Sequence, residues 1–179
     1  AGGGKGNVGV PAPASTPEFL VKLIGQKYGL DLVPVPYKGS APMMADMMGN
    51  QIPAGVASVP DFIENHKAGK LRIVAVLGGK RQALLPDVPT FAELGFKSMI
   101  ETPWLGMFCA PEVPAAVQVK LHTNLNEMLA QAQIRERWKD IGLMVPPQPL
   151  PTQQALVQTL QTESATQAKR LAAIGYQAQ

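Results

Sequence analysis

Short apolar runs and helical stripes alternate along the first half of the chain, which is the pattern of repeated strand-helix units. Residues 7–10 and 31–35 are predicted to be strands, and an amphipathic helix is predicted between them over 16–28. Gly29 is expected to end that helix, because glycine readily adopts the left-handed conformation that follows many helices. The pattern therefore predicts parallel strands joined by helices.

The same alternation continues to about residue 101. Five further elements are expected there: helices over 41–48 and 60–67, strands over 52–57 and 71–77, and a short helix that Thr90 and Glu93 begin as a capping box. The run 71–77 is almost wholly apolar, which is typical of a parallel strand buried on both faces.

The second half of the chain is predicted to be rich in helix. A strand is expected over 104–110, and helices over 114–130, 134–141 and 152–174, the last capped by Thr152. Cys109 lies in the apolar run of that strand, so a buried position is expected for it rather than a reactive one.

Composition favours a globular α/β protein over a helical bundle. Among 179 residues, 46% are hydrophobic and 16% charged, and the 17 glycines and 17 prolines imply many turns between short elements. The sixteen lysines and arginines are scattered and the net charge is only +3, so no nucleic-acid partner is expected. No apolar stretch approaches the roughly 20 residues that a membrane-spanning helix needs. Residues 1–6 are predicted to be a flexible lead-in, and they do not have the pattern of a signal sequence.

Three predicted strand-to-helix turns carry the candidate binding chemistry. Ser15 or Thr16 is expected to cap the helix after the first strand, and Ser40 the helix after the second, while Ser58 precedes the helix after the third. Turns of this kind gather at the carboxyl ends of parallel strands, where helix N-termini bind anions. The sequence therefore predicts a carboxylate site at this edge of the sheet.

The remaining candidates lie in the same turns. Lys38 adds a cation, Gly39 allows close approach of the backbone, and Ala14 offers its backbone N–H. The predicted ligand-binding set is Ala14, Ser15, Thr16, Lys38, Gly39, Ser40 and Ser58. For each serine or threonine the alternative is an ordinary helix cap, and for Lys38 it is a solvated side chain.

Candidates for catalysis are few. His66 and His122 each lie within a predicted helix, and neither has metal-ligand spacing to another histidine, cysteine or carboxylate. No nucleophile, base and orienting group can be grouped from the sequence. The prediction is a protein that is not an enzyme and that needs no cofactor or metal.

A longer resemblance extends from the turn at 35–42 through the segments 46–49, 67–71, 85–90 and 104–106. In this order these segments resemble the Bug/TctC family of extracytoplasmic solute receptors, the binding proteins of tripartite tricarboxylate transporters. The resemblance implies a two-lobed, periplasmic-binding-protein-like α/β fold of type II. It assigns 7–101 to the ligand-binding lobe, called domain 2, and 102–179 to the C-terminal part of domain 1. The chain then resembles a C-terminal fragment without the signal peptide and the start of that first domain.

The function implied by this resemblance is capture of a small mono-, di- or tricarboxylate between the lobes of a monomeric periplasmic receptor, which delivers it to the membrane subunits of the transporter. At Ala57 relatives often have an acidic residue that could pair with an ammonium group, so its absence weakly favours a simple organic acid. The sequence does not name the acid. The alternative is the effector-binding domain of a transcription regulator, a class with the same two-lobed architecture.

Overall fold

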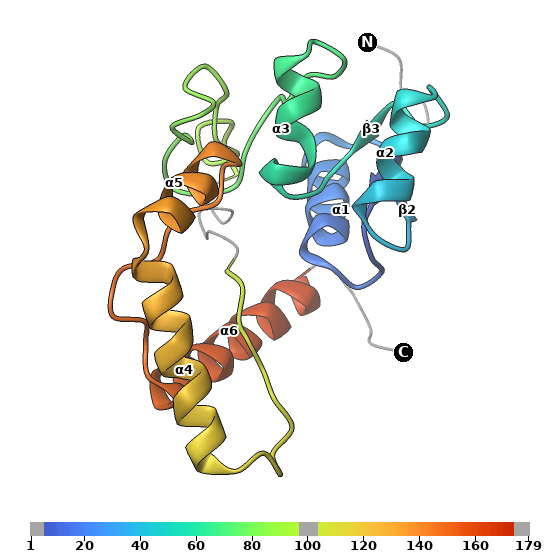
Figure 1. The fold of residues 1–179 in the computed structure, drawn as a ribbon. Coiled ribbons are helices and arrows are strands. Elements are labelled where there is room, and N and C mark those ends of the chain that lie inside the picture. Colours follow the sequence, from blue (N-terminus) through green and yellow to red (C-terminus); the bar gives the residue numbers. More distant parts are fainter. Residues whose placement is uncertain (1–5, 97–103, 174–179) are drawn as a thin grey trace. The chain divides into compact units, whose positions relative to one another are not determined.

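The computed structural model describes residues 6–96 and 104–173, which belong to two compact units (Figure 1). The first unit is Ala1–Asp61 with Pro151–Gln179, and the second is Phe62–Leu150. These bounds differ from those of the lobes expected from the sequence, 7–101 and 102–179, whose assignment stays a prediction.

The first unit contains a three-stranded parallel sheet with the strand order β2-β1-β3. Its strands are β1 (Gly6–Val10), β2 (Leu32–Pro36) and β3 (Ala54–Gly55), and the helices that follow them are α1 (Thr16–Tyr28), α2 (Ser40–Met48) and α3 (Val59–Lys67). Val8 lies opposite Pro34 on one side and Ala54 on the other. The predicted α/β class is confirmed, although β3 is shorter than the predicted strand 52–57.

The core of this sheet depends on two glycines that let α2 pack closely. A Cβ on Gly9 of β1 would lie 2.6 Å from Met43 Cγ, and one on Gly55 of β3 would lie 2.7 Å from Met47 Sδ. Met43 itself is fully buried. Adjacent strands without side chains at these positions therefore make room for the methionines of α2. In α1, Leu20 is fully buried as well.

The end of α1 also follows the sequence prediction. Gly29 has φ of 62°, and its N–H donates to the carbonyl of Gly25. A Cβ on Gly29 would meet no atom within 4 Å, so glycine is favoured there by the backbone conformation alone.

Two predicted strands are absent. Within 71–77 only Val76 forms a bridge, which pairs it with Thr90, and Val74 is 69% exposed. The run 104–110 forms no strand, and Cys109 is exposed rather than buried. Both strand predictions were wrong, because an apolar run forms a strand only where a neighbour takes up its backbone hydrogen bonds.

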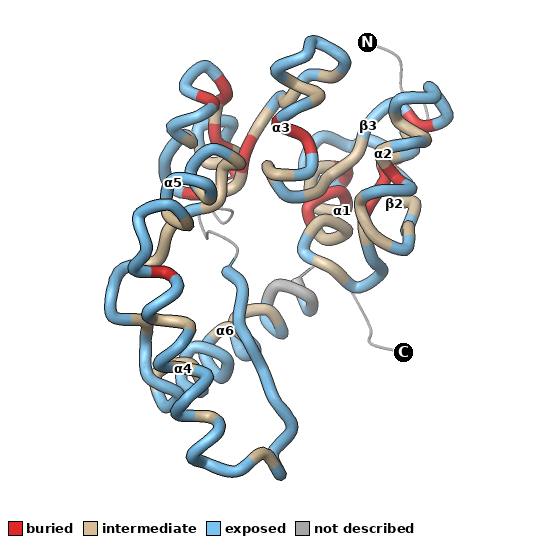
Figure 2. Tube along the Cα trace, in the orientation of Figure 1, coloured by how far each residue is buried: buried red, intermediate tan, exposed pale blue. Residues whose placement is uncertain are grey.

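The C-terminal helices follow the sequence more closely. They are α4 (Ala115–Ala130), α5 (Ala132–Asp140) and α6 (Gln153–Ala173). The Ala155 N–H donates to Thr152 Oγ1 at 3.2 Å, which confirms the predicted cap of α6. The predicted end of that helix at Ile174 lies outside the described residues. Figure 2 shows that α4 is mostly exposed, and Leu129 is its buried residue. Among the described residues, no helix combines the length and apolar character that crossing a membrane requires.

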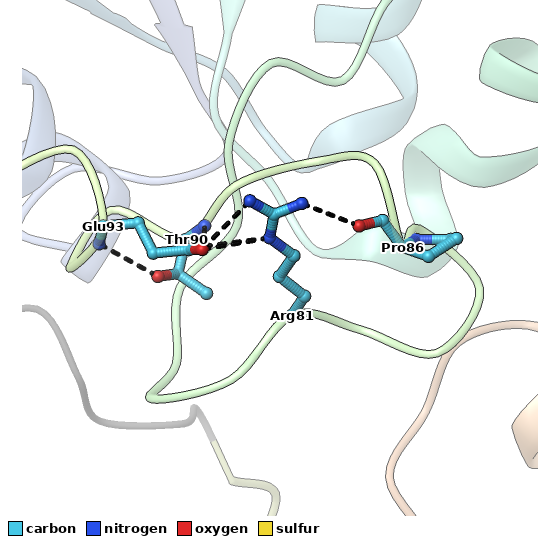
Figure 3. A network of polar contacts seen from close by, with 4 residues as sticks. All are labelled: Arg81, Pro86, Thr90 and Glu93. Atoms are coloured by element: carbon cyan, nitrogen blue, oxygen red, sulfur yellow. Dashed lines mark hydrogen bonds and ion pairs between the residues drawn. The ribbon is translucent and has the colours of Figure 1, made fainter.

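Thr90 and Glu93 form both hydrogen bonds of a capping box (Figure 3). The Thr90 N–H donates to Glu93 Oε2 at 2.7 Å, and the Glu93 N–H donates to Thr90 Oγ1 at 3.1 Å. Residues 91–95 nevertheless form turns, so the predicted short helix was wrong. Arg81 pairs with Glu93 Oε1 at 3.0 Å and donates to the Pro86 carbonyl at 2.9 Å. The Arg81 side chain is the main reason that the pKa of Glu93 is lowered to about 2.

Candidate ligand-binding site

The three strand-to-helix turns meet at the carboxyl edge of the sheet, as the sequence predicts. The Gly39 N–H, in the turn after β2, donates to the Pro11 carbonyl in the turn after β1 at 2.9 Å. The Val56 N–H, after β3, donates to the Gly9 carbonyl at 2.9 Å. The strand order β2-β1-β3 places a topological switch point between β1 and β3, where open α/β sheets bind their ligands.

The second turn begins α2 with a glycine in an unusual backbone conformation. Gly39 is the N-cap of α2, with φ of 103° and ψ of 174°, a conformation that is almost restricted to glycine. Ser40 is the first helical residue, so the prediction that Ser40 caps the helix was wrong. A Cβ on Gly39 would meet no atom within 4 Å. An anion therefore has space to approach the first N–H groups of α2.

Asp61 joins the second and third turns. Ser40 Oγ donates to Asp61 Oδ1 at 2.8 Å, and Ser58 Oγ donates to Asp61 Oδ2 at 2.5 Å. The Ser58 N–H also donates to Asp61 Oδ2, at 3.1 Å. Reasoning from the sequence did not include Asp61 in the site. The signal was available, because Ser58-Val59-Pro60-Asp61 has the spacing of a capping box.

In the first turn, the side chain of Glu18 accepts a backbone hydrogen bond. The Ala14 N–H donates to Glu18 Oε2 at 2.7 Å, and Ala14 has a positive φ of 52°. Ser15 is the N-cap of α1 by position, but its hydroxyl donates to the Ala12 carbonyl at 2.6 Å instead of capping the helix. The Lys22 ammonium lies 2.6 Å from Glu18 and is the main reason that the pKa of Glu18 is lowered. The Ala14 N–H and the Ser15 hydroxyl are therefore already engaged.

A comparison of the three helix starts singles out α2. The first turn of α1 contains Glu18 and that of α3 contains Asp61, whereas that of α2 contains no acidic residue. A carboxylate near a helix N-terminus offsets the positive end of the helix dipole. Of these three helices, α2 alone has no acidic residue of its own in the first turn, and the nearby carboxylate of Asp61 comes from α3.

Two other predicted residues lie at different helix starts, Lys38 just before Gly39 and Thr16 as the first residue of α1. Lys38 is exposed, and its part in binding stays a prediction, as does that of the exposed Thr16. Tyr37, next to Lys38, donates its hydroxyl to Asp46 Oδ2 at 2.7 Å, and this bond raises the pKa of Tyr37. The Tyr37 bond joins the second turn to the last turn of α2.

The two histidines have structural contacts. His66 Nδ1 accepts the Ile73 N–H at 3.3 Å, and His122 Nδ1 lies 3.3 Å from Asn126 Nδ2. Within 6–96 and 104–173, no group of three or more His, Cys, Asp or Glu residues could hold a metal ion.

The model of the tripartite tricarboxylate transporter family receptor, TctC, matches residues 2–175. The chain belongs to this family of solute receptors. BugT of Bordetella pertussis is 30% identical over 131 residues, which is 73% of this chain and 40% of that protein.

Solved structures agree with this assignment. A protein of R. palustris, Rpa4515 with adipate, has a TM-score of 0.84 and 25% identity, with 95% of this chain and 56% of that one covered. The periplasmic binding protein BugD has a TM-score of 0.84 and 26% identity, with 96% and 57% covered. The chain thus spans about half the length of the relatives that it matches, and the periplasmic-binding-protein-like fold predicted from the sequence is confirmed.

Proposed function

We propose that this chain is part of a periplasmic receptor that captures a small organic carboxylate and delivers it to the membrane subunits of a tripartite tricarboxylate transporter. The observation that carries the proposal is the start of α2. Gly39 has free space where a Cβ would lie, Ser40 and Ala41 offer backbone N–H donors, and the first turn of the helix contains no acidic residue. The relative solved with adipate supports a carboxylate as the ligand class.

The expected energies fit reversible binding. A helix N-terminus contributes about 0.3 to 1 kcal/mol to a bound anion, and about 2 kcal/mol when the site is partly buried. Charge-assisted hydrogen bonds from backbone N–H groups add to this. Together with contacts from a second lobe, such terms support micromolar affinity, on the order of −8 kcal/mol. A transport receptor needs affinity in this range, because it must also release its ligand.

Residues 7–101 form the ligand-binding lobe in this proposal, and 102–179 belong to the other lobe. Closure of the two lobes buries the ligand, and the closed form is the one presented to the membrane subunits. The receptor works as a monomer without a cofactor and does no chemistry on its ligand.

Thermal melting of the intact protein tests the proposal. The protein is heated with mono-, di- and tricarboxylates in turn, and with neutral sugars as controls. A ligand that binds only the native state at a hundredfold excess over its Kd stabilises that state by about 2.7 kcal/mol, which raises Tm by several degrees. A shift from one class of acids is expected. No shift from any acid, with a cooperative transition in the same samples, would reject the carboxylate receptor.

A further inference from the structure

The hydrogen bonds of Asp61 determine which chemical groups Ser40 and Ser58 present to a ligand. An ionised carboxylate only accepts hydrogen bonds, so each serine must use its single O–H proton to bond Asp61. What remains on each serine oxygen is acceptor capacity. In this arrangement the two hydroxyl oxygens can accept a hydrogen bond from a donor group of the ligand, but they cannot donate one to an anion.

The same carboxylate places a negative charge beside the open start of α2. Asp61 Oδ1 lies 2.8 Å from the hydroxyl of Ser40, and Ser40 is the first residue of that helix. A ligand carboxylate on the first N–H groups of α2 therefore lies close to a like charge. A hydrogen-bond donor next to the ligand carboxylate would relieve this repulsion and meet the acceptors of Asp61, Ser40 and Ser58.

We propose that Asp61 is a specificity-determining residue that selects acids with a hydroxyl or ammonium group next to the carboxylate. The proposal rests on the carboxylate-receptor function and narrows its substrate class. The carboxylate of the ligand binds the start of α2, and the neighbouring donor bonds Asp61 and the two serines. Ala57 has no acidic side chain, so the sequence favoured a plain acid, but Asp61 supplies the carboxylate from α3 instead.

Two matched ligand series test this selection on the intact protein by calorimetric titration. One series is succinate, malate and aspartate, and the other is adipate, 2-hydroxyadipate and 2-aminoadipate. Within a series the molecules differ only at the carbon beside one carboxylate. A hydrogen bond to a charged group supports a preference of about tenfold or more for a donor-bearing acid over its parent. Comparison of the hydroxy and amino members identifies which donor the site takes.

Variants of Asp61 separate selection from folding. Asp61→Asn removes the charge and turns one acceptor oxygen into an NH2 donor, which frees one of the two serines to donate, so the preference for the donor-bearing acid is expected to fall to within about threefold of the parent acid. Asp61→Glu keeps the charge and is expected to retain most of the preference. Asp31→Asn is the matched control, because Asp31 is exposed and lies before β2, at the opposite end of that strand from Ser40. This control should leave the ranking unchanged.

The outcomes distinguish the two proposals. If plain diacids bind as tightly as their hydroxy and amino derivatives in the unmodified protein, Asp61 does not select the ligand, while the carboxylate receptor stands. If Asp61→Asn leaves the order of affinities within each acid series unchanged, the proposal that Asp61 selects the ligand is contradicted as well. If no acid of either series binds the folded protein, the receptor function fails and this inference fails with it.

Discussion

Ser40 and Asp61 are 21 positions apart in the sequence, yet Ser40 Oγ donates a 2.8 Å hydrogen bond to Asp61 Oδ1. The contact joins the start of α2, which follows β2, to the first turn of α3, which follows β3. These strands lie on opposite sides of β1. One carboxylate therefore fixes the distance between two helix starts at the carboxyl edge of the sheet.

Removal of this carboxylate should reduce stability. Asp61→Ala eliminates the two bonds from Ser58 and the one from Ser40, and an exposed network of this size contributes about 1 kcal/mol to the free energy of unfolding. Urea unfolding of the intact protein measures the loss. Asp31→Ala, which removes an exposed acid before β2, should change the free energy by less than about 0.5 kcal/mol. Equal effects of the two substitutions would contradict the bracing role of Asp61.

Gly39 should be needed for both folding and binding. Gly39→Ala places a side chain at φ of 103°, and strain of this kind costs about 1 to 3 kcal/mol. The new Cβ also stands at the open start of α2, so carboxylate affinity should fall about tenfold. The matched control is Gly29→Ala, where φ is also positive but the residue ends α1. Gly29→Ala should lower Tm without changing the affinity; weaker binding in both variants would indicate that strain alone is responsible.

The packing of Gly9 against Met43 should appear as energetic coupling. Gly9→Ala brings a methyl group to within 2.6 Å of Met43 Cγ, and such overpacking costs about 1 to 3 kcal/mol. Met43→Ala alone leaves a cavity and costs about 2 to 5 kcal/mol. The double variant should be less destabilised than the sum of the two, because the added methyl group partly fills the cavity. Additive losses in urea unfolding would show that the two residues do not share this space.

The pH dependence of stability should include a contribution from Glu93. Its pKa in the folded protein is about 2, held below the ordinary value mainly by the hydrogen bond from Arg81. Because the folded pKa is depressed, the stabilisation is present above the unfolded pKa of about 4.3 and is lost as the pH falls from about 5 towards 2.

Substitution of Glu93 checks this contribution. Glu93→Gln should lower stability at pH 7 and flatten the decline between pH 5 and pH 2 in a series of thermal melts. Glu112→Gln, at an exposed position of the same compact unit, serves as the control and should keep the slope of the unmodified protein. A parallel decline for Glu93→Gln and the unmodified protein would refute the assignment.

Local signals predicted the elements of the first unit well. The bounds of α1 and its end at Gly29 follow from an apolar stripe and a glycine, and α2 begins within one residue of the prediction. These features depend on neighbouring residues, so the sequence is sufficient for them. The meeting of the three turns was also predicted, because parallel strands require it.

Long-range pairing was predicted less well. The run 71–77 has the composition of a buried strand, but composition does not reveal whether a neighbouring strand is present, and only Val76 pairs. Asp61 was missed for a related reason. Its capping-box spacing with Ser58 is local, whereas its bond to Ser40 depends on how two separate helix starts meet in space.

The proposed receptor function requires that a carboxylate binds at the start of α2. Backbone amide shifts in 15N-labelled intact protein test it directly, during titration with the acid that raises Tm most. Saturable shifts of the Gly39, Ser40 and Ala41 amides are expected, with a midpoint that matches the calorimetric Kd. Saturable binding with shifts confined to amides away from the turns after β1, β2 and β3 would contradict it.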